Sequence, residues 1–154
     1  MVEKPSTPLV YPVQPTFITV RESHFISHRP PSDSDRIDQS NVRINQTASQ
    51  FNEETRRIQV TVVAEFGFEE TPATPPPFSA KLAIVGEFVI DDSFPRDKIK
   101  LWASKNAPFV IYPYLRERLH ELTNQGGHPP ILLPLLQIPT FSLSAPPVKV
   151  PESK

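Results

Sequence analysis

Two segments in the middle of the chain alternate apolar and polar residues, and a proline-rich connection separates them. A period of two that persists over residues 58–68 and again over residues 80–90 is typical of strands with one buried face. The connection, Glu69–Ser79, has too many prolines for a helix and is too short for a parallel crossover. The two strands are therefore expected to be antiparallel neighbours. Their apolar positions are Ile58, Val60, Val62, Ala64, Phe66 and Phe68 in the first, and Ala80, Leu82, Ile84, Phe88 and Ile90 in the second.

Two further strands are expected before this pair. Residues 16–27 predict a strand with Ile18, Val20 and Ile26 on one face, and residues 42–51 predict a weaker one. The polar stretch between them, with Pro30-Pro31, predicts a loop or a crossover.

Helices are expected after the pair. Helical periodicity begins near Pro95, where a proline fits a first turn. Asn106 is predicted to be the N-cap of a second helix, and Gly126 its left-handed C-cap. Pro113 should interrupt the hydrogen bonding of this helix unless it lies in the first turn. The predicted apolar stripe is Val110, Ile111, Tyr114, Leu115, Leu119 and Leu122.

Four antiparallel strands followed by helices predict an α+β fold. The chain has 154 residues, which suits one domain, and its 38% hydrophobic content is low for a monomer. With 20 prolines against 4 glycines, the ends are expected to be irregular. We expect a flexible N-terminus over residues 1–15, one domain over residues 16–141 and a proline-rich tail over residues 142–154.

The composition argues against several classes of protein. With 16 basic and 17 acidic residues, the chain lacks the clustered positive charge that binds nucleic acid. It contains no cysteine, which excludes disulfides and thiolate zinc sites and fits a cytosolic protein. No apolar run has the length of a signal peptide core or a membrane span. A cytoplasmic location is therefore expected, without an integral membrane segment.

No residue pattern predicts catalysis, a cofactor or a metal. His24 and His28 lie on a predicted strand, where four positions span roughly 13 Å, too far to share an ion. Asp91-Asp92 is better explained as a turn entering a helix than as a catalytic pair. The four glycines form no phosphate loop, and no nucleophile motif occurs. We expect a protein that is not an enzyme.

One segment is more specific than the rest: residues 107–134, APFVIYPYLRERLHELTNQGGHPPILLP. An amphipathic helix that opens with prolines closes on a double glycine and runs into a Pro-Leu-rich extended stretch. This order of parts resembles the C-terminal half of the SecB export-chaperone family. The matching positions are Pro108, Val110, Ile111, Tyr112, Pro113, Tyr114, Arg116, Glu117, Gly126, Gly127, Pro129, Pro130, Ile131, Leu132 and Leu133.

The resemblance implies both an assembly and a function. Each subunit would carry a four-stranded antiparallel sheet, two subunits would form an eight-stranded sheet, and two such dimers would pack into a homotetramer. The family holds non-native polypeptides without ATP, in long grooves between crossover loop, sheet and helix. The positions matching that lining are Val42, Ile44, Tyr112, Leu115, Leu119 and Leu122.

The family also passes clients to the SecA motor through an acidic sheet face. Glu22 matches the first of two family carboxylates, but Ile26 replaces the second. The other docking motif of the family is Leu-Gly-Glu at the end of the third strand. Phe66 and Gly67 hold its apolar and glycine places, but Phe68 stands where the family has Glu, and Glu69 follows one position later. Weak or absent SecA coupling is therefore expected. Such departures resemble SecB-like proteins with other clients, including chaperones that protect the antitoxin of a toxin–antitoxin system.

Two classes of function follow from the sequence. The first is a holdase chaperone, either general or dedicated to one client. The second is an oligomeric adaptor that binds one folded partner or an apolar small molecule. A holdase should slow the aggregation of unrelated unfolded proteins at stoichiometric ratios, whereas an adaptor should not.

Overall fold

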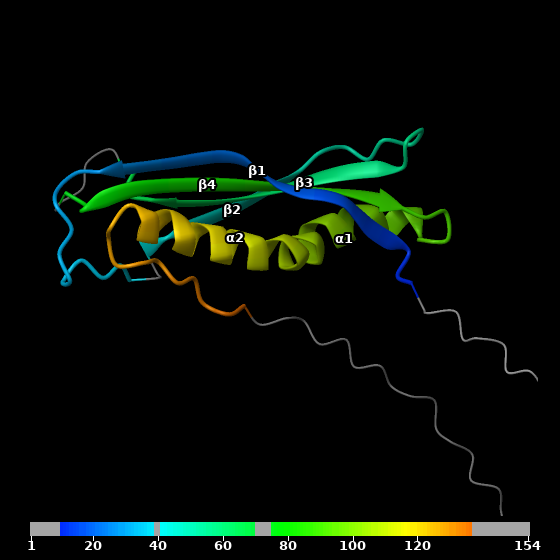
Figure 1. Cartoon of the computed structure of the whole chain (residues 1–154). Helices are drawn as coiled ribbons and strands as arrows, with labels where there is room; N and C mark the ends of the chain where they lie inside the picture. Colours follow the sequence, from blue (N-terminus) through cyan, green and yellow to red (C-terminus); the bar gives the residue numbers. More distant parts are fainter. Residues whose placement is uncertain (1–9, 39–40, 70–74, 137–154) are drawn as a thin grey trace, which may run out of the picture.

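The chain folds into one antiparallel sheet with helices on a single face (Figure 1). The computed structural model describes residues 10–38, 41–69 and 75–136. The strand order is β1-β4-β3-β2, so the central pair is the two strands that the alternation predicts. The strands are β1 (Val13–Ser27), β2 (Arg43–Ala48), β3 (Arg57–Phe66) and β4 (Phe78–Ile90). The predicted α+β class and antiparallel pairing are confirmed.

A short 3-10 helix, η2 (Arg96–Lys98), leads into α1 (Ile99–Lys105) and then into α2 (Ala107–Gln125). Both α-helices lie against the same face of the sheet, which we call the helix face (Figure 1). The opposite face, which no helix of the described residues covers, is the open face. After α2 the chain turns and runs back beside that helix; residues 128–136 are the return segment (Figure 1).

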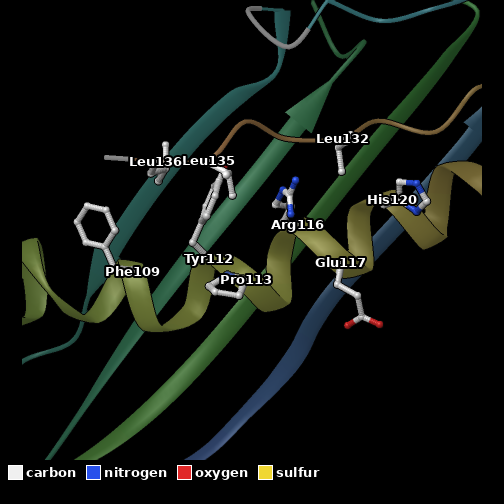
Figure 2. Close-up of a pocket in the computed structure, with 9 residues that line it drawn as sticks. All are labelled: Phe109, Tyr112, Pro113, Arg116, Glu117, His120, Leu132, Leu135 and Leu136. Carbon is white, nitrogen blue, oxygen red and sulfur yellow. The ribbon is translucent and has the colours of Figure 1, made fainter. Parts of the chain in front are cut away.

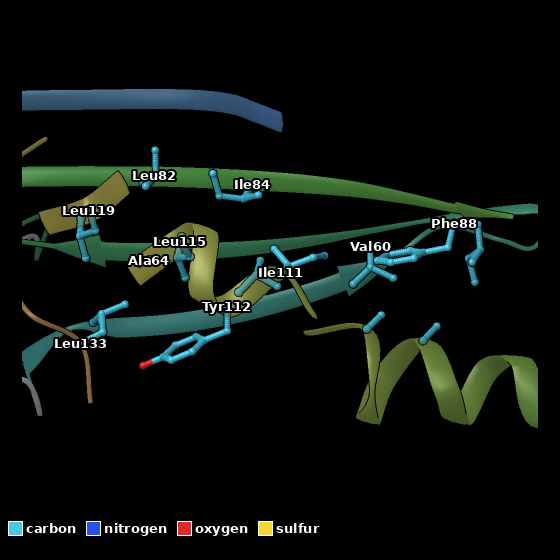
Figure 3. Packing of buried hydrophobic residues seen from close by; sticks show 14 of the residues in the cluster. Val60, Ala64, Leu82, Ile84, Phe88, Ile111, Tyr112, Leu115, Leu119 and Leu133 are labelled. Carbon is cyan, nitrogen blue, oxygen red and sulfur yellow. The ribbon is translucent and has the colours of Figure 1, made fainter. Parts of the chain in front are cut away.

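The alternating residues of β3 and β4 form the core that the sequence predicts. Their helix-face side chains pack against α2 and are nearly all inaccessible to water (Figure 3). Burial of this apolar surface is the main favourable term in the folding of such a layer. The largest contributors are Val60, Leu82, Ile84 and Phe88 from the sheet, and Ile111, Leu115 and Leu119 from α2.

The predicted face of β1 is partly wrong, because the strand contains a bulge. The register with β4 shifts between Val20 and Glu22, so one extra residue on β1 reverses the alternation beyond it. Ile26 therefore lies on the open face, where it is 51% exposed, and does not share a face with Val20. Phe25 takes the inward position instead and stacks on Phe78, with ring centroids 5.3 Å apart.

The boundaries of the strands also differ from the prediction. β1 begins at Val13, which pairs with Ile90, so the predicted irregular N-terminus already forms sheet at its end. β3 ends at Phe66, because Gly67 has φ +80 and breaks the extended geometry. Phe68 is therefore not part of the alternation, and its side chain is exposed.

The predicted caps of α2 are right in position but wrong in geometry. Asn106 is the N-cap residue, but it has helical backbone angles and makes no side-chain capping bond; its N–H donates to Trp102 O at the end of α1. Gly126 keeps φ −71, and the left-handed residue is Gly127 at φ +79. Gly126 is required for a different reason: a Cβ there would lie 2.2 Å from the ring of Phe25.

The apolar stripe of α2 is rotated from the predicted one. Val110 and Tyr114 are largely exposed, whereas Tyr112 and Thr123 are buried. The cause is the return segment, which covers a second side of the helix and encloses Tyr112 and Thr123. Pro113 lies in the helix interior, past the first turn, so it cannot donate to the carbonyl of Phe109.

The two left-handed glycines give a matched test of the turn before β4. Gly67→Ala should destabilise the protein much more than Gly127→Ala. Both pay about 1–2 kcal/mol for a left-handed alanine. Only at Gly67 would the new Cβ meet backbone, at 2.5 Å from Phe78 O, which adds roughly 1–3 kcal/mol of strain. Urea denaturation measures both, and equal losses would contradict this account.

Candidate functional site

The return segment is attached to α2 by side chains of the helix. The Tyr112 hydroxyl donates to Pro134 O at 2.5 Å, and Arg116 Nε donates to Leu133 O at 2.7 Å. The two donors are four residues apart, so they lie one turn apart on the same side of the helix. They satisfy carbonyls of a segment that has no strand partner.

A third attachment is fully buried. The Thr123 hydroxyl accepts a hydrogen bond from Ile131 N at 2.9 Å and donates to Leu119 O at 3.0 Å. Ile131 itself is 2% exposed and belongs to the core cluster. This hydroxyl therefore supplies the acceptor that the Ile131 amide would otherwise lack inside the protein.

His128 fixes the start of the return segment to β1. Its ring is buried between Phe25 and Phe78, and Nε2 lies 2.8 Å from Ser27 Oγ. Nδ1 of the same ring is buried and has no hydrogen-bond partner among the residues that the structure describes. His128 therefore attaches the turn after α2 to the end of β1.

Between α2 and the return segment lies a groove of about 410 Å³ (Figure 2). Its walls are mainly apolar, and its volume falls in the range of roughly 300–1,000 Å³ that is common for ligand sites. The lining residues are Phe109, Tyr112, Pro113, Arg116, Glu117, His120, Leu132, Leu135 and Leu136. We call this site the return groove.

Of the six residues predicted to bind clients, only Tyr112 lines the return groove. Leu115 and Leu119 are buried in the core, and Leu122 is half-buried on the same helix. Val42 is buried, whereas Ile44 is 39% exposed on β2. The part of these residues in client binding stays a prediction.

Arg116, Leu132, Leu135 and Leu136 also line the groove, but they are not among the residues that the sequence predicts to bind clients. The spacing of the groove positions in the sequence could have indicated this side of the helix. Positions 109, 112, 113, 116, 117 and 120 recur at helical spacing on one side of α2, opposite the Leu-rich stretch of residues 131–136. None of these positions belongs to the predicted core stripe, and the sequence does not show that the return segment runs back along this side of the helix.

The open face carries paired charges. Lys81 Nζ lies 3.4 Å from a Glu22 carboxylate oxygen and 3.5 Å from one of Glu65. The hydrogen bond from Lys81 lowers the pKa of Glu22, and the bond to Glu22 raises the pKa of Lys81. The negative charge of Glu22 is therefore locally compensated. Of the other two predicted motor-docking positions, Phe66 packs on the Phe78 ring at 5.2 Å and Glu69 is exposed.

Within the described residues, no group of three or more His, Cys, Asp or Glu side chains could hold a metal ion. No helix in that part of the chain is long and apolar enough to cross a membrane.

Comparison with known families settles the wider assignment. The family model described as preprotein translocase subunit SecB matches residues 31–139, which includes the whole return groove. The chain belongs to the SecB family. SecB proteins are chaperones and not enzymes, so the predicted family and the prediction of a non-enzymatic protein are confirmed.

The relatives of this chain are distant. It is 24% identical over 120 residues to an uncharacterized protein of Methanocaldococcus jannaschii, covering 77% of this chain and 75% of that protein. It is 26% identical over 77 residues to the protein-export protein SecB of Anaplasma phagocytophilum, which is 49% of each chain.

A solved structure has the same fold. It is the Mycobacterium tuberculosis Rv1957 SecB-like chaperone in complex with a ChAD peptide from the Rv1956 HigA1 antitoxin. The TM-score is 0.68 at 19% identity, over 83% of this chain and 93% of that one. At this identity, the comparison establishes the fold of the subunit.

The buried threonine allows a test of how the groove wall is held. Thr123→Val keeps the shape of the side chain but leaves the Ile131 amide without its acceptor. We expect a loss of about 1–3 kcal/mol in the free energy of unfolding. Thr123→Ser keeps the hydroxyl and should cost less. Hydrogen exchange should show faster exchange of the Ile131 amide in the valine variant only; unchanged protection would contradict this role.

Proposed function

We propose that this protein is an ATP-independent holdase that binds non-native polypeptides in the return groove. The observation that carries the proposal is the groove itself, which exposes apolar side chains beside a helix in a member of a chaperone family. Leu135 is 82% exposed, and Leu132 and Leu136 are 48% and 43% exposed. Isolated surface leucines are ordinary, but a contiguous apolar groove marks a binding site.

The shape of the groove suits an extended chain. One wall is the helix and the other is a segment without regular structure, so a client segment can lie along α2 between them (Figure 2). An unfolded polypeptide offers apolar side chains on an unpaired backbone, which is what such a groove recognises. The antitoxin peptide bound by the tuberculosis relative supports a peptide client of this kind. The place of action we propose is the cytoplasm.

The groove leucines give the direct test. Replacing both Leu135 and Leu136 with Asp should weaken binding of an unfolded client at least about tenfold, because each buried leucine contributes roughly 1.5–3 kcal/mol. Both side chains are exposed, so the fold should persist. The measurement is suppression of aggregation of an unrelated unfolded protein at stoichiometric ratio.

Ile26→Asp is the matched control, because the exposure of Ile26, 51%, lies between those of Leu136 and Leu135, but its side chain is on the open face. It should leave the suppression unchanged. A wild-type protein that binds one folded partner but suppresses no aggregation would favour the adaptor function instead.

We also propose that the protein is a homo-oligomer, most simply a tetramer. Val20, Val110 and Tyr114 are each at least 40% exposed, and Val20 and Tyr114 line a common hollow of about 180 Å³ beside α2. This apolar strip adjoins β1, which is an edge strand of the sheet. Removing the strip and the edge from water requires another subunit.

Tyr114→Asp tests the oligomer without disturbing the core. The variant should sediment as a smaller species than wild type at micromolar concentration while its circular dichroism spectrum stays the same. A wild-type protein that sediments as a folded monomer would refute the proposal.

Weak coupling to SecA stays a separate prediction, which titration of the motor at low ionic strength would decide.

A further inference from the structure

Pro113 leaves one backbone acceptor of α2 without its usual donor. In an α-helix, the carbonyl of each residue accepts from the N–H four positions later, and Pro113 has no N–H to offer Phe109 O. The helix nevertheless continues from Ala107 to Gln125. A proline in a helix interior is strongly unfavourable, so α2 is weaker than it would be with another residue there.

The unpaired carbonyl lies on the groove side of α2. Side chains four positions apart lie on the same side of a helix, and the carbonyl of the first residue points along the helix toward the second. Phe109 and Pro113 both line the return groove, so the carbonyl between them borders it as well (Figure 2). Pro113 is exposed, so this part of the helix is accessible from outside.

No other group of the described residues bonds to this acceptor. Two polar side chains on the same side of α2 are engaged with the return segment. The Tyr112 hydroxyl donates to Pro134 O. Arg116 Nε donates to Leu133 O. Within the part of the chain that the structure describes, neither a side chain nor a backbone N–H outside the helix donates to Phe109 O.

We propose that Phe109 O accepts a hydrogen bond from a backbone N–H of the client bound in the return groove. This inference rests on the proposed holdase function and names what the groove recognises in its substrate. Most N–H groups of a folded protein are already paired, whereas those of an unfolded segment are free. Apolar contacts alone do not make this distinction. The substrate class is therefore an extended apolar segment with unpaired N–H groups.

The hydrogen bond and the apolar contacts are compatible in one extended chain. Side chains of such a chain point alternately to two faces, and its N–H groups point sideways, between those faces. Alternate apolar side chains can therefore enter the groove while one N–H points at the helix wall. Every residue except proline carries this donor, so the bond fixes the register of a client without requiring a particular sequence.

Carbonyl NMR tests the contact on the wild-type protein. Phenylalanine labelled with ¹³C at the carbonyl and valine labelled with ¹⁵N together select Phe-Val peptide bonds. The sequence has two, Phe88–Val89 and Phe109–Val110. The probe is Leu-Ser-Val-Ser-Leu-Ser-Val-Ser-Leu, acetylated and amidated, because it contains no aromatic ring that would itself shift a signal.

Binding of this probe should move the Phe109 carbonyl signal downfield, in the direction that a new hydrogen bond causes. The Phe88 signal should stay in place, because Phe88 lies in the core. A bound peptide that leaves the Phe109 signal unmoved overturns the inference.

Peptides methylated at one backbone nitrogen identify the donor. Each member of the set carries the methyl group at a different position and a fluorophore at the N-terminus, and anisotropy gives its Kd. On wild-type protein, at least one position should weaken binding about fivefold or more, because the hydrogen bond is lost there. Because the methyl group also occupies space, the same set is measured on a variant.

Pro113→Ala supplies the missing donor from within the helix. An N–H at position 113 pairs with Phe109 O, which should raise the melting temperature by at least about 2 °C. The unmethylated peptide should bind more weakly, and the methylation penalty should fall to within about twofold. A residue that only builds the helix would not give higher stability together with weaker binding.

Pro108→Ala is the matched control. Pro108 lies in the first turn of the same helix, where a missing N–H has no intrahelical partner, and it does not line the groove. This variant should keep the wild-type methylation penalty.

The outcomes separate this inference from the proposed function. Equal methylation penalties in wild type and Pro113→Ala overturn the inference alone. A Pro113→Ala variant without a gain in melting temperature means that Phe109 O is already paired, which also overturns it. If that variant does not fold, the carbonyl signal of the wild-type protein decides. Wild-type protein that binds none of the peptides overturns the holdase function together with the inference.

Discussion

The architecture depends on α2, which packs against the sheet on one side and forms hydrogen bonds to the return segment on another. One side of α2 contributes Ile111, Leu115 and Leu119 to the sheet core. Another side satisfies the backbone of a proline-rich segment that cannot form a strand ladder. Buried backbone groups without partners are costly, so the hydrogen bonds from α2 side chains help to hold the return segment in place. The groove is the space that this arrangement leaves between the two.

The bulge in β1 has a comparable effect on the sheet. The extra residue after Val20 sends Phe25 inward and Ile26 outward. Phe25 then meets Phe78, His128 and the backbone of Gly126, so it fixes the end of α2 and the start of the return segment. The same reversal places Glu22 on the open face, where Lys81 compensates its charge. The extra residue in β1 therefore affects both the position of the return segment, which borders the groove, and the charges on the open face.

Much of the fold could be predicted from the sequence, and much less of the site. The alternation in β3 and β4 has a single interpretation, because only a strand with one buried face repeats every two residues over such a length. The groove lining is different, since Phe109 and Arg116 share a helix with core residues. Their exposure depends on where the return segment runs. Val110 and Tyr114 fit the predicted core stripe equally well, yet they lie on the surface.

The sequence by itself determined the strand pairing, the helical region, the family and the non-enzymatic character, because these depend on local periodicity and on the motif of residues 107–134. The tertiary structure decided the rest. Whether Gly126 or Gly127 takes the left-handed conformation, and whether Phe25 or Ile26 enters the core, depends on contacts between residues far apart in the chain. The same holds for Arg116, whose Nε donates to the carbonyl of Leu133 on another segment.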